Sequence, residues 1–258
     1  MNQDEINRII SEVIAAQANT AREAALSTPR DLKSFPATCR AAVLTSPGNI
    51  ELRELPIREI NDDEILIKVE GCGVCGTDVH EFKGDPMGLA PLVLGHEGTG
   101  EIVRLGKNIK QDSGGKRVQV GDKLVTSVST CGKCDACLYT PNRLNLCESL
   151  RVHGLIPDDE THLNGYFAEY RIVRADSTFF VVNDLSLELR MLIEPAAVVV
   201  HALERAKSTG LLNFRSRVLI QGCGPIGLLM LAAVRAAGTQ HIIALDGDEN
   251  RLDMARRM

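Results

Sequence analysis

Cys72 and Cys75 are separated by two residues and are followed at once by Thr77, Asp78 and His80. Such a pair could be a redox couple, half of a metal site, or two unrelated thiols. The sequence holds eight cysteines, and its first residues are polar and acidic rather than a basic stretch followed by an apolar one. Cysteines in a chain without an export signal favour metal binding or catalysis over disulfides.

A second group of cysteines is denser. Cys131, Cys134, Cys137 and Cys147 have the spacing C-x2-C-x2-C-x9-C. Short spacings let one loop wrap around a single ion, and four thiolates complete a tetrahedral zinc with no open coordination position. The pattern therefore predicts a structural zinc that stabilises a loop with little core of its own. An iron–sulfur cluster is the alternative.

His96 and Glu97 lie between an apolar stretch and a glycine turn. A lone histidine in such a place is more often an ordinary polar residue of a turn. A catalytic zinc, however, needs protein ligands and one position left for water or substrate. The pairing with Cys75, together with the later four-cysteine loop, favours metal binding by His96.

Gly222, Gly224 and Gly227 form G-x-G-x-x-G directly after a strand-like apolar run and open a helical one. Glycines let such a turn approach a pyrophosphate, which then lies on the helix N-terminus. Asp246 ends the next strand about 20 residues further on, where an acid can bind the adenosine ribose. This position favours NAD over NADP; a surface acid is the alternative. Arg251 could flank the adenosine or be a solvated helix charge.

The elements that would position these residues fall into three segments. The sequence pattern of residues 1–37 predicts an amphipathic helix followed by a flexible linker. Residues 38–185 consist of short strands and glycine turns, which suggests a partly open barrel. Residues 186–258 contain a helix followed by strand, glycine turn, helix, strand and the start of a helix, which is a βαβ unit. The fold class is mixed α/β.

Composition narrows the range of partners. The net charge is −5 and no basic tract is present, which argues against a nucleic-acid partner. The longest apolar run, Ile226 to Val234, is too short to cross a bilayer. We therefore expect a cytoplasmic protein that acts on a small molecule.

Taken together, the motifs resemble those of one family, the zinc-dependent medium-chain alcohol and polyol dehydrogenases, over about residues 40–258. The segments that carry the resemblance are "GCGVCGTDVH", "GHEGTGEIV", "VGDKLV", the four-cysteine loop, "GYFAEY", "EPAAVVVHA" and "GCGPIG". The resemblance implies a GroES-like β-barrel catalytic domain followed by an incomplete Rossmann domain. It also implies one catalytic zinc, one structural zinc, and hydride transfer between NAD and a secondary alcohol or polyol, with an aldehyde or ketone as the oxidised partner.

The resemblance also assigns roles to the residues of the first motifs. Cys75 and His96 correspond to ligands of the catalytic zinc, and Cys72 becomes a bystander. For the remaining ligand two acids are candidates. Glu97 ligates the metal in parts of the family, and Glu194 stands where the polyol, threonine and secondary-alcohol branches have a carboxylate near the metal. Both are predicted to be metal residues.

Three further side chains have roles that the resemblance implies. Asp78 is similar to a group that holds His96 by its free ring nitrogen; it could also simply cap a turn. Thr77 is similar to the hydroxyl link of a proton relay, and His80 to its exit to solvent. A hydroxyl that caps a turn is the alternative for Thr77.

Two rivals remain at this point. A zinc-free quinone or enoyl reductase would have the same fold, but the intact zinc motifs argue against it. A complete dinucleotide domain has two βαβαβ halves, and this sequence stops after the second strand. We therefore expect a piece of a longer protein that is a homo-oligomer when full length. A truncated, non-catalytic zinc-binding fragment or scaffold is the alternative.

The first residues carry aliphatic side chains at helical spacing: Ile6, Ile9, Ile10, Val13 and Ile14. Residues 1–17 resemble the peptides that load enzymes into bacterial microcompartments, which implies a shell protein as partner and a location inside such a compartment. A frayed extension, or a helix that packs on its own subunit, is the alternative.

Overall fold

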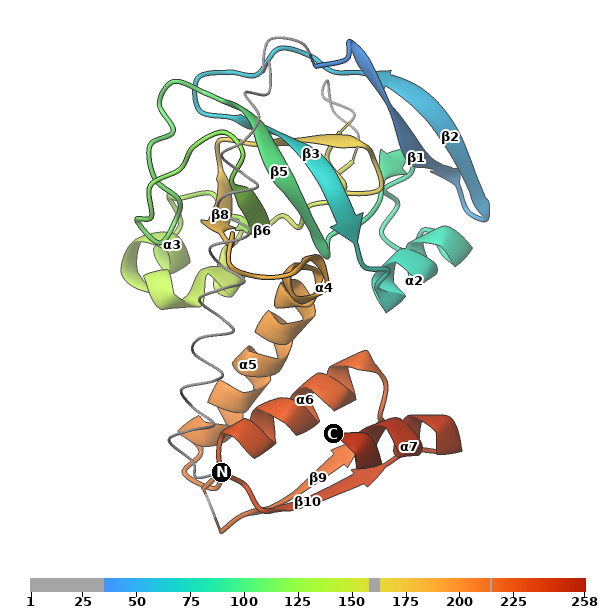
Figure 1. Cartoon of the computed structure of the whole chain (residues 1–258), viewed down its shortest axis with the longest axis vertical. Coiled ribbons are helices and arrows are strands. Elements are labelled where there is room, and N and C mark those ends of the chain that lie inside the picture. The colour runs from blue at the N-terminus through green and yellow to red at the C-terminus, as the bar shows by residue number, and fades with distance from the viewer. Residues whose placement is uncertain (1–34, 158–162, 214) are drawn as a thin grey trace, which may run out of the picture.

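The computed structural model describes residues 35–157, 163–213 and 215–258. It has a large β-rich lobe and a small α/β lobe, and α5 (Ile193–Ser208) runs from one to the other (Figure 1). The helix predicted for residues 1–17 lies outside the described residues. No described helix has both the length and the apolar character needed to cross a membrane.

Two antiparallel sheets build the large lobe. The first has the strand order β7-β3-β5-β6-β8 and the second β2-β1-β4. The bounds of the strands are β1 (Thr38–Ser46), β2 (Asn49–Pro56), β3 (Ile65–Cys72), β4 (Leu92–Val93), β5 (Gly98–Leu105), β6 (Lys123–Ser129), β7 (Tyr170–Val173) and β8 (Ser177–Val181). The described strands do not close into one ring, and the two sheets form the β-rich domain that the sequence predicts.

The first three residues of β3 lie in the core of this lobe and are buried on both faces of the sheet. Ile65 and Ile67 pack in one apolar cluster with Ile102, whereas Leu66 points to the other side and packs with Ile172. Successive side chains of a strand point to opposite faces, so three consecutive aliphatic residues need a core on each side. Because β3 and β5 are this firmly packed, the loops at their ends start from rigid positions.

Three short helices follow strands of the large lobe. Helix α2 (Gly76–Gly84) comes directly after β3, and α3 (Asp135–Tyr139) and the 3-10 helix η1 (Pro141–Leu146) follow β6. Helix α2 ends at Asp85, which adopts the left-handed conformation with φ 44°. The first hairpin, β1–β2, turns at Gly48 with φ 76°.

The small lobe contains the predicted βαβ unit. Its elements are β9 (Arg217–Gln221), α6 (Pro225–Ala236), β10 (His241–Leu245) and α7 (Glu249–Arg257). Helix α4 (Leu187–Met191) packs against β3 and β5 of the large lobe and leads into α5. Strands β9 and β10 are parallel, and α6 connects them. The βαβ prediction is confirmed, whereas the domain boundaries at 37/38 and 185/186 stay predictions.

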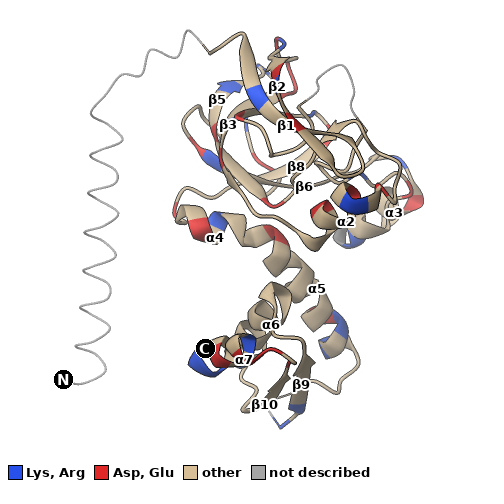
Figure 2. Cartoon of the chain, turned by 90° about the vertical axis from the view of Figure 1, so that its right-hand side faces the viewer, with Lys and Arg blue, Asp and Glu red and all other residues tan. Residues whose placement is uncertain are grey.

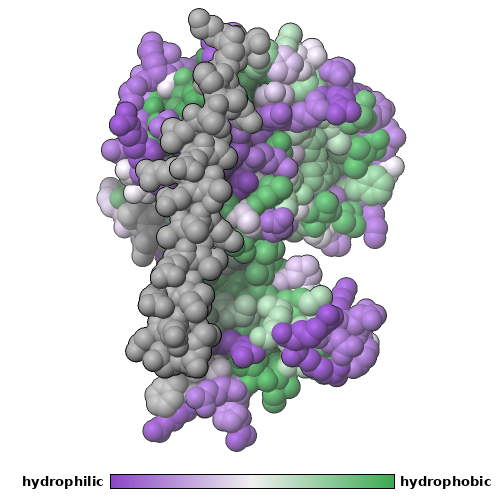
Figure 3. All heavy atoms as spheres, viewed as in Figure 1, coloured by the Kyte–Doolittle hydropathy of each residue, from purple (hydrophilic) through white to green (hydrophobic). Residues whose placement is uncertain are grey.

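The surface differs between the lobes. Acidic and basic residues are interspersed along the ribbon of the large lobe (Figure 2). Apolar side chains gather around the connecting helix and the small lobe (Figure 3). There Leu219, Ile243 and Leu245 of the two-stranded sheet are 62%, 60% and 53% exposed.

Candidate metal and coenzyme sites

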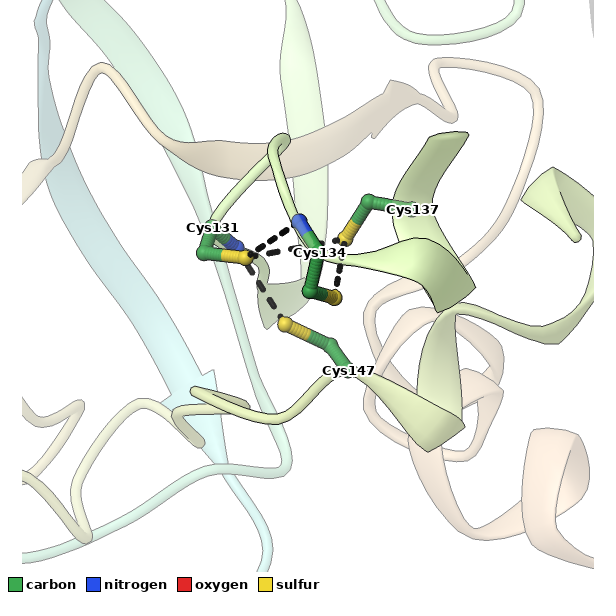
Figure 4. Close-up of side chains that lie close together, drawn as sticks. All are labelled: Cys131, Cys134, Cys137 and Cys147. Atoms are coloured by element: carbon green, nitrogen blue, oxygen red, sulfur yellow. Dashed lines mark hydrogen bonds between the residues drawn. The ribbon is translucent and has the colours of Figure 1, made fainter. Parts of the chain in front are cut away.

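The four-cysteine loop folds so that its thiols converge (Figure 4). All four Sγ atoms lie within 4.8 Å of one another. The Sγ–Sγ distance is 3.5 Å between Cys134 and Cys137 and 4.0 Å between Cys131 and Cys137. These distances are far longer than the ~2.05 Å of a disulfide. The arrangement is therefore a set of separate thiols around a common centre.

The pKa values of these thiols indicate that their common centre requires a cation. Backbone N–H groups of Lys133 and Cys134 lower the pKa of Cys131 to about 6. Burial, together with the neighbouring thiols, raises the pKa of Cys137 to about 11. Four thiols this close cannot all ionise unless a cation neutralises them, because like charges disfavour each other's ionisation. Four sulfur donors at these separations fit a tetrahedral zinc with no open position.

A second cluster joins Cys75, His96 and Glu97, whose ligand atoms also lie within 4.8 Å of one another. Cys75 is the N-cap of α2, directly after β3, while His96 and Glu97 directly precede β5. The cluster offers one sulfur, one nitrogen and one carboxylate. His96 is buried, and the other two side chains are partly exposed. Three protein donors with partial solvent access fit a zinc that keeps one position for another ligand.

Asp78 connects the two loops of this cluster. Its carboxylate is 3% exposed; Oδ2 accepts a 2.8 Å hydrogen bond from the Cys75 backbone N–H, and Oδ1 accepts a 3.3 Å bond from Gly95. Oδ1 also lies 3.5 Å from Nδ1 of His96. Both predicted roles of Asp78 are therefore compatible with its position, because it caps α2 and lies beside His96.

Charge around His96 favours a cation. Burial disfavours its imidazolium form, but the carboxylate of Asp78 and the thiol of Cys75 outweigh burial and raise the pKa of His96 to about 9. Surroundings that favour a positive imidazolium also favour a metal ion, because the same negative groups attract either one. The donor set and its field thus both fit a bound zinc.

Gly73 lies against Glu97, a contact that the sequence motifs do not predict. A Cβ atom on Gly73 would lie 2.3 Å from Oε2 of Glu97, and the Gly73 N–H donates to the Glu97 backbone oxygen at 3.1 Å. Only glycine leaves room for the carboxylate at this point. The two glycines that flank Cys72 in "GCG" are the signal that could have indicated the contact.

Glu194 lies in the first turn of α5 and does not belong to the three-residue cluster. Burial raises the pKa of its carboxyl group, His96 opposes that shift, and Glu97 and Asp78 add to it. Its side chain is therefore close enough to interact electrostatically with the cluster. Between the two acids predicted for the metal, the geometry favours Glu97 as the direct ligand.

The remaining residues of the first motif surround Cys75. The thiol of Cys75 lies 3.7 Å from the Thr77 hydroxyl, and His80, one turn later on α2, is exposed. Cys72 is outside the cluster: its thiol donates to the Gly73 carbonyl at 3.2 Å, and burial raises its pKa to about 12. The structure thus separates the two cysteines of the C-x-x-C pair by environment.

The glycine turn of the small lobe links β9 to α6. Gly222 has φ 95°, a conformation that favours glycine, and Gly224 is the N-cap of α6. A Cβ atom on Gly227 would lie 1.8 Å from the Gly222 carbonyl oxygen, so the helix could not approach the strand this closely with any other residue. The three glycines therefore form a tight turn whose helix N-terminus is suited to a pyrophosphate.

Asp246 lies beside this turn. Its Oδ2 accepts a 2.7 Å hydrogen bond from the Cys223 N–H and its Oδ1 accepts a 2.9 Å bond from Asp248, and these bonds lower its pKa. Nη1 of Arg251 lies 3.8 Å from Oδ2. The carboxylate thus stays ionised and holds the glycine turn, and it has unused acceptor positions for a ribose.

Comparison with known proteins agrees with this arrangement. Residues 61–183 match the alcohol dehydrogenase GroES-like domain. The chain is similar to sorbitol dehydrogenase from Bacillus subtilis strain 168, with 37% identity over 229 residues, covering 87% of this chain and 60% of that protein. It is also similar to D-arabinitol dehydrogenase 1 from Uromyces fabae, with 35% identity, 88% of this chain and 60% of that protein.

Among solved structures, an alcohol dehydrogenase from Thermotoga maritima superimposes with a TM-score of 0.78 at 29% identity, covering 86% of this chain and 61% of that one. The chain thus spans about 60% of the length of these relatives. Residues 61–183 thus carry an alcohol dehydrogenase GroES-like domain, and the chain is similar in sequence to polyol dehydrogenases and in fold to an alcohol dehydrogenase.

Proposed function

We propose that this chain carries the zinc site and the coenzyme turn of an NAD-dependent dehydrogenase that oxidises a secondary alcohol or a polyol. The observation that carries the proposal is the cluster of Cys75, His96 and Glu97, because it offers three different donors and partial access to solvent. The sugar alcohols in the names of the relatives support a polyol as substrate. The four-cysteine loop would hold a second, structural zinc.

The residues around the Cys75 cluster would have different roles. Cys75, His96 and Glu97 would hold the zinc. Glu194 would lie near the metal, because its carboxyl group interacts electrostatically with His96 and Glu97. A zinc ion bound there supplies a Lewis acid that makes a substrate hydroxyl group more acidic. The buried carboxylate of Asp78 keeps Cys75 and His96 at a fixed separation through its hydrogen bonds to both loops.

The proton of the alcohol needs a route to solvent, and α2 offers one. Thr77 and His80 are three residues apart and therefore share one face of the helix. Thr77 is half-buried beside Cys75 and His80 is exposed. The hydroxyl of Thr77 would pass the proton outward, and the exposed imidazole of His80 would exchange it with water.

NAD is the proposed coenzyme. Gly222, Gly224 and Gly227 would receive the pyrophosphate, Asp246 the ribose hydroxyls, and Arg251 would flank the adenosine. Asp246→Ala should weaken NAD binding by about 1–3 kcal/mol, the range for a lost charge-assisted hydrogen bond. The measurement is NAD and NADP titration of the full chain; tighter binding of NADP by the unmutated protein would contradict the role of Asp246.

The activity itself is tested with a panel of secondary alcohols and polyols, followed by NADH absorbance, with Cys75→Ser as control. Turnover that this variant abolishes supports the proposal. A protein that contains both zinc ions and binds NAD but gives no turnover would favour the alternative, a non-catalytic zinc-binding fragment or scaffold. The full-length protein is proposed to be cytoplasmic and to form a homo-oligomer. Light scattering measures the oligomeric state.

We also propose that residues 1–17 bind a microcompartment shell protein. The support is the spacing of the aliphatic residues, which would form one apolar stripe on a helix. The test fuses residues 1–37 to a fluorescent protein in a cell that assembles a matching shell. Diffuse fluorescence with the native segment, equal to that of an Ile9→Glu, Ile10→Glu control, would refute this location.

A further inference from the structure

A buried guanidinium contacts β3 and β5, the strands next to the loops of Cys75, His96 and Glu97. Arg190 belongs to α4 and is 7% exposed. Its Nη1 donates hydrogen bonds to Oε2 of Glu70 on β3 and, at 3.3 Å, to the hydroxyl of Thr99 on β5. One nitrogen therefore bridges the two strands that lead into, and out of, the proposed metal-ligand loops.

Glu70 lies at an irregularity of β3. Val69 pairs with Gly100 and Gly71 pairs with Thr99, so Glu70 has no opposite residue in the β3–β5 ladder. An extra residue of this kind is a β-bulge, which bends its strand and turns the following side chains. Here the bulge comes directly before the loop that carries Cys75. Its conformation therefore sets the direction of that loop.

The bulge is held from both sides. Oε1 of Glu70 accepts a 2.6 Å hydrogen bond from Lys123 on β6, while Oε2 accepts from Arg190. Helix α4 also packs directly on the next residue, since a Cβ atom on Gly71 would lie 2.6 Å from Sδ of Met191. On the other strand, Thr99 is fully buried and donates its hydroxyl hydrogen to the Leu124 carbonyl.

The buried charge of Arg190 does not by itself explain a gain in folding stability. Its Nε is buried and has no hydrogen-bond partner among the described residues. Burying a cation with an unsatisfied donor is costly, and only one partner of the Arg190–Glu70 pair is buried. A role in geometry accounts for a polar bridge at this point better than a role in stability does.

We propose that Arg190 is a positioning residue: by joining the Glu70 bulge to Thr99, it fixes the separation between the Cys75 loop and the loop of His96 and Glu97. The proposal rests on the proposed metal site. Arg190 also connects that site to the helix that leads to the small lobe, because α4 leads directly into α5, whose first turn carries Glu194.

The test measures Co²⁺ affinity of the full chain at each cluster, using cobalt absorption and a competing chelator. Arg190→Met should weaken Co²⁺ binding at the Cys75 cluster by about 10–100-fold, the usual effect of losing a group that orients metal ligands. Binding at the four-cysteine loop should not change, so that loop is an internal reference. Arg190→Lys, which keeps the positive charge and one donor nitrogen, should give an intermediate loss.

Two further variants separate positioning from stability. Glu70→Leu combined with Arg190→Met replaces the pair of buried Arg190 and exposed Glu70 by apolar side chains; it should regain thermal stability, because neither charge is left without its partner, but keep the weakened Co²⁺ binding. Arg58→Met removes another arginine from a buried glutamate, Glu64, away from the cluster; it should lower stability and leave Co²⁺ binding unchanged.

Unchanged Co²⁺ affinity in Arg190→Met would overturn the proposal, as would recovery of affinity in the double variant, which would show a merely structural role. A failure of the metal site itself looks different: Cys75→Ser would then bind as much Co²⁺ as the unmutated chain. The two failures are therefore distinguishable.

Discussion

The two cysteine-containing clusters are organised in opposite ways. The four-cysteine cluster takes all its donors from one loop between residues 131 and 147, and α3 within it has no buried residue. The cluster of Cys75, His96 and Glu97 takes its donors from two loops that extend from β3 and β5 in the middle of the core. A metal must hold the first loop together, whereas the fold already holds the second cluster.

This difference predicts which cluster supports stability. Cys134→Ser should lower stability more than any other single substitution proposed for this chain, because the binding energy of a structural metal is folding energy for its loop. Cys75→Ser should leave the unfolding temperature close to that of the unmutated protein. Thermal unfolding with zinc present measures both. Equal losses in the two variants would contradict the distinction.

Metal removal should follow the same division. The cluster with three protein donors leaves a position open to a chelator, whereas four thiolates enclose the ion. Zinc release into a chelating dye should therefore have a fast and a slow phase, and Cys75→Ser should lack the fast one. A single phase in the unmutated protein would mean that the two clusters do not differ in access.

Gly73→Ala sharpens the comparison within the second cluster. The added Cβ would lie 2.3 Å from Oε2 of Glu97 and displace that carboxylate. Zinc affinity at this cluster should fall by about 10-fold or more if Glu97 is a ligand. Gly76→Ala is the matched control, because its Cβ would meet nothing within 4 Å. Equal affinities in both variants would indicate Glu194 as the ligand instead.

The smallest effect concerns an ion pair outside both clusters. The side chain of Arg58 lowers the pKa of Glu64 from its ordinary value of 4.5. A lowered folded-state pKa means that the pair stabilises the protein above pH 4.5 and loses this contribution as the pH falls through the folded pKa. Glu64→Gln should therefore cost about 1–3 kcal/mol at neutral pH.

Denaturant unfolding across this pH range measures the contribution of the pair. The difference between Glu64→Gln and the unmutated protein should shrink below pH 4.5. Zinc content should stay the same in both. A difference that persists at low pH would mean that the loss does not come from the ionised carboxylate.

How much the sequence predicts depends on how local each feature is. The four cysteines and the three glycines lie in short segments, so their spacing alone indicates a converging loop and a tight turn. The βαβ unit also follows from the local sequence pattern. Cys75 and His96 are separated by a helix and a strand, and only their motifs suggest that they meet.

Other features depend on distances that no spacing contains. The choice between Glu97 and Glu194 requires the position of α5 relative to the large lobe. The contact of Gly73 with Glu97 requires the path of two loops. The bridge from Arg190 to Glu70 and Thr99 requires the register of β3 against β5, since a bulge is visible only when the ladder is known.

The most direct test of this account is the zinc content of the purified chain and of its Cys75→Ser variant, measured by elemental analysis. The account predicts about two zinc ions per chain, one closed and one open site, and the loss of one of them in the variant with the fold intact. A single zinc per chain that Cys75→Ser does not change would contradict it.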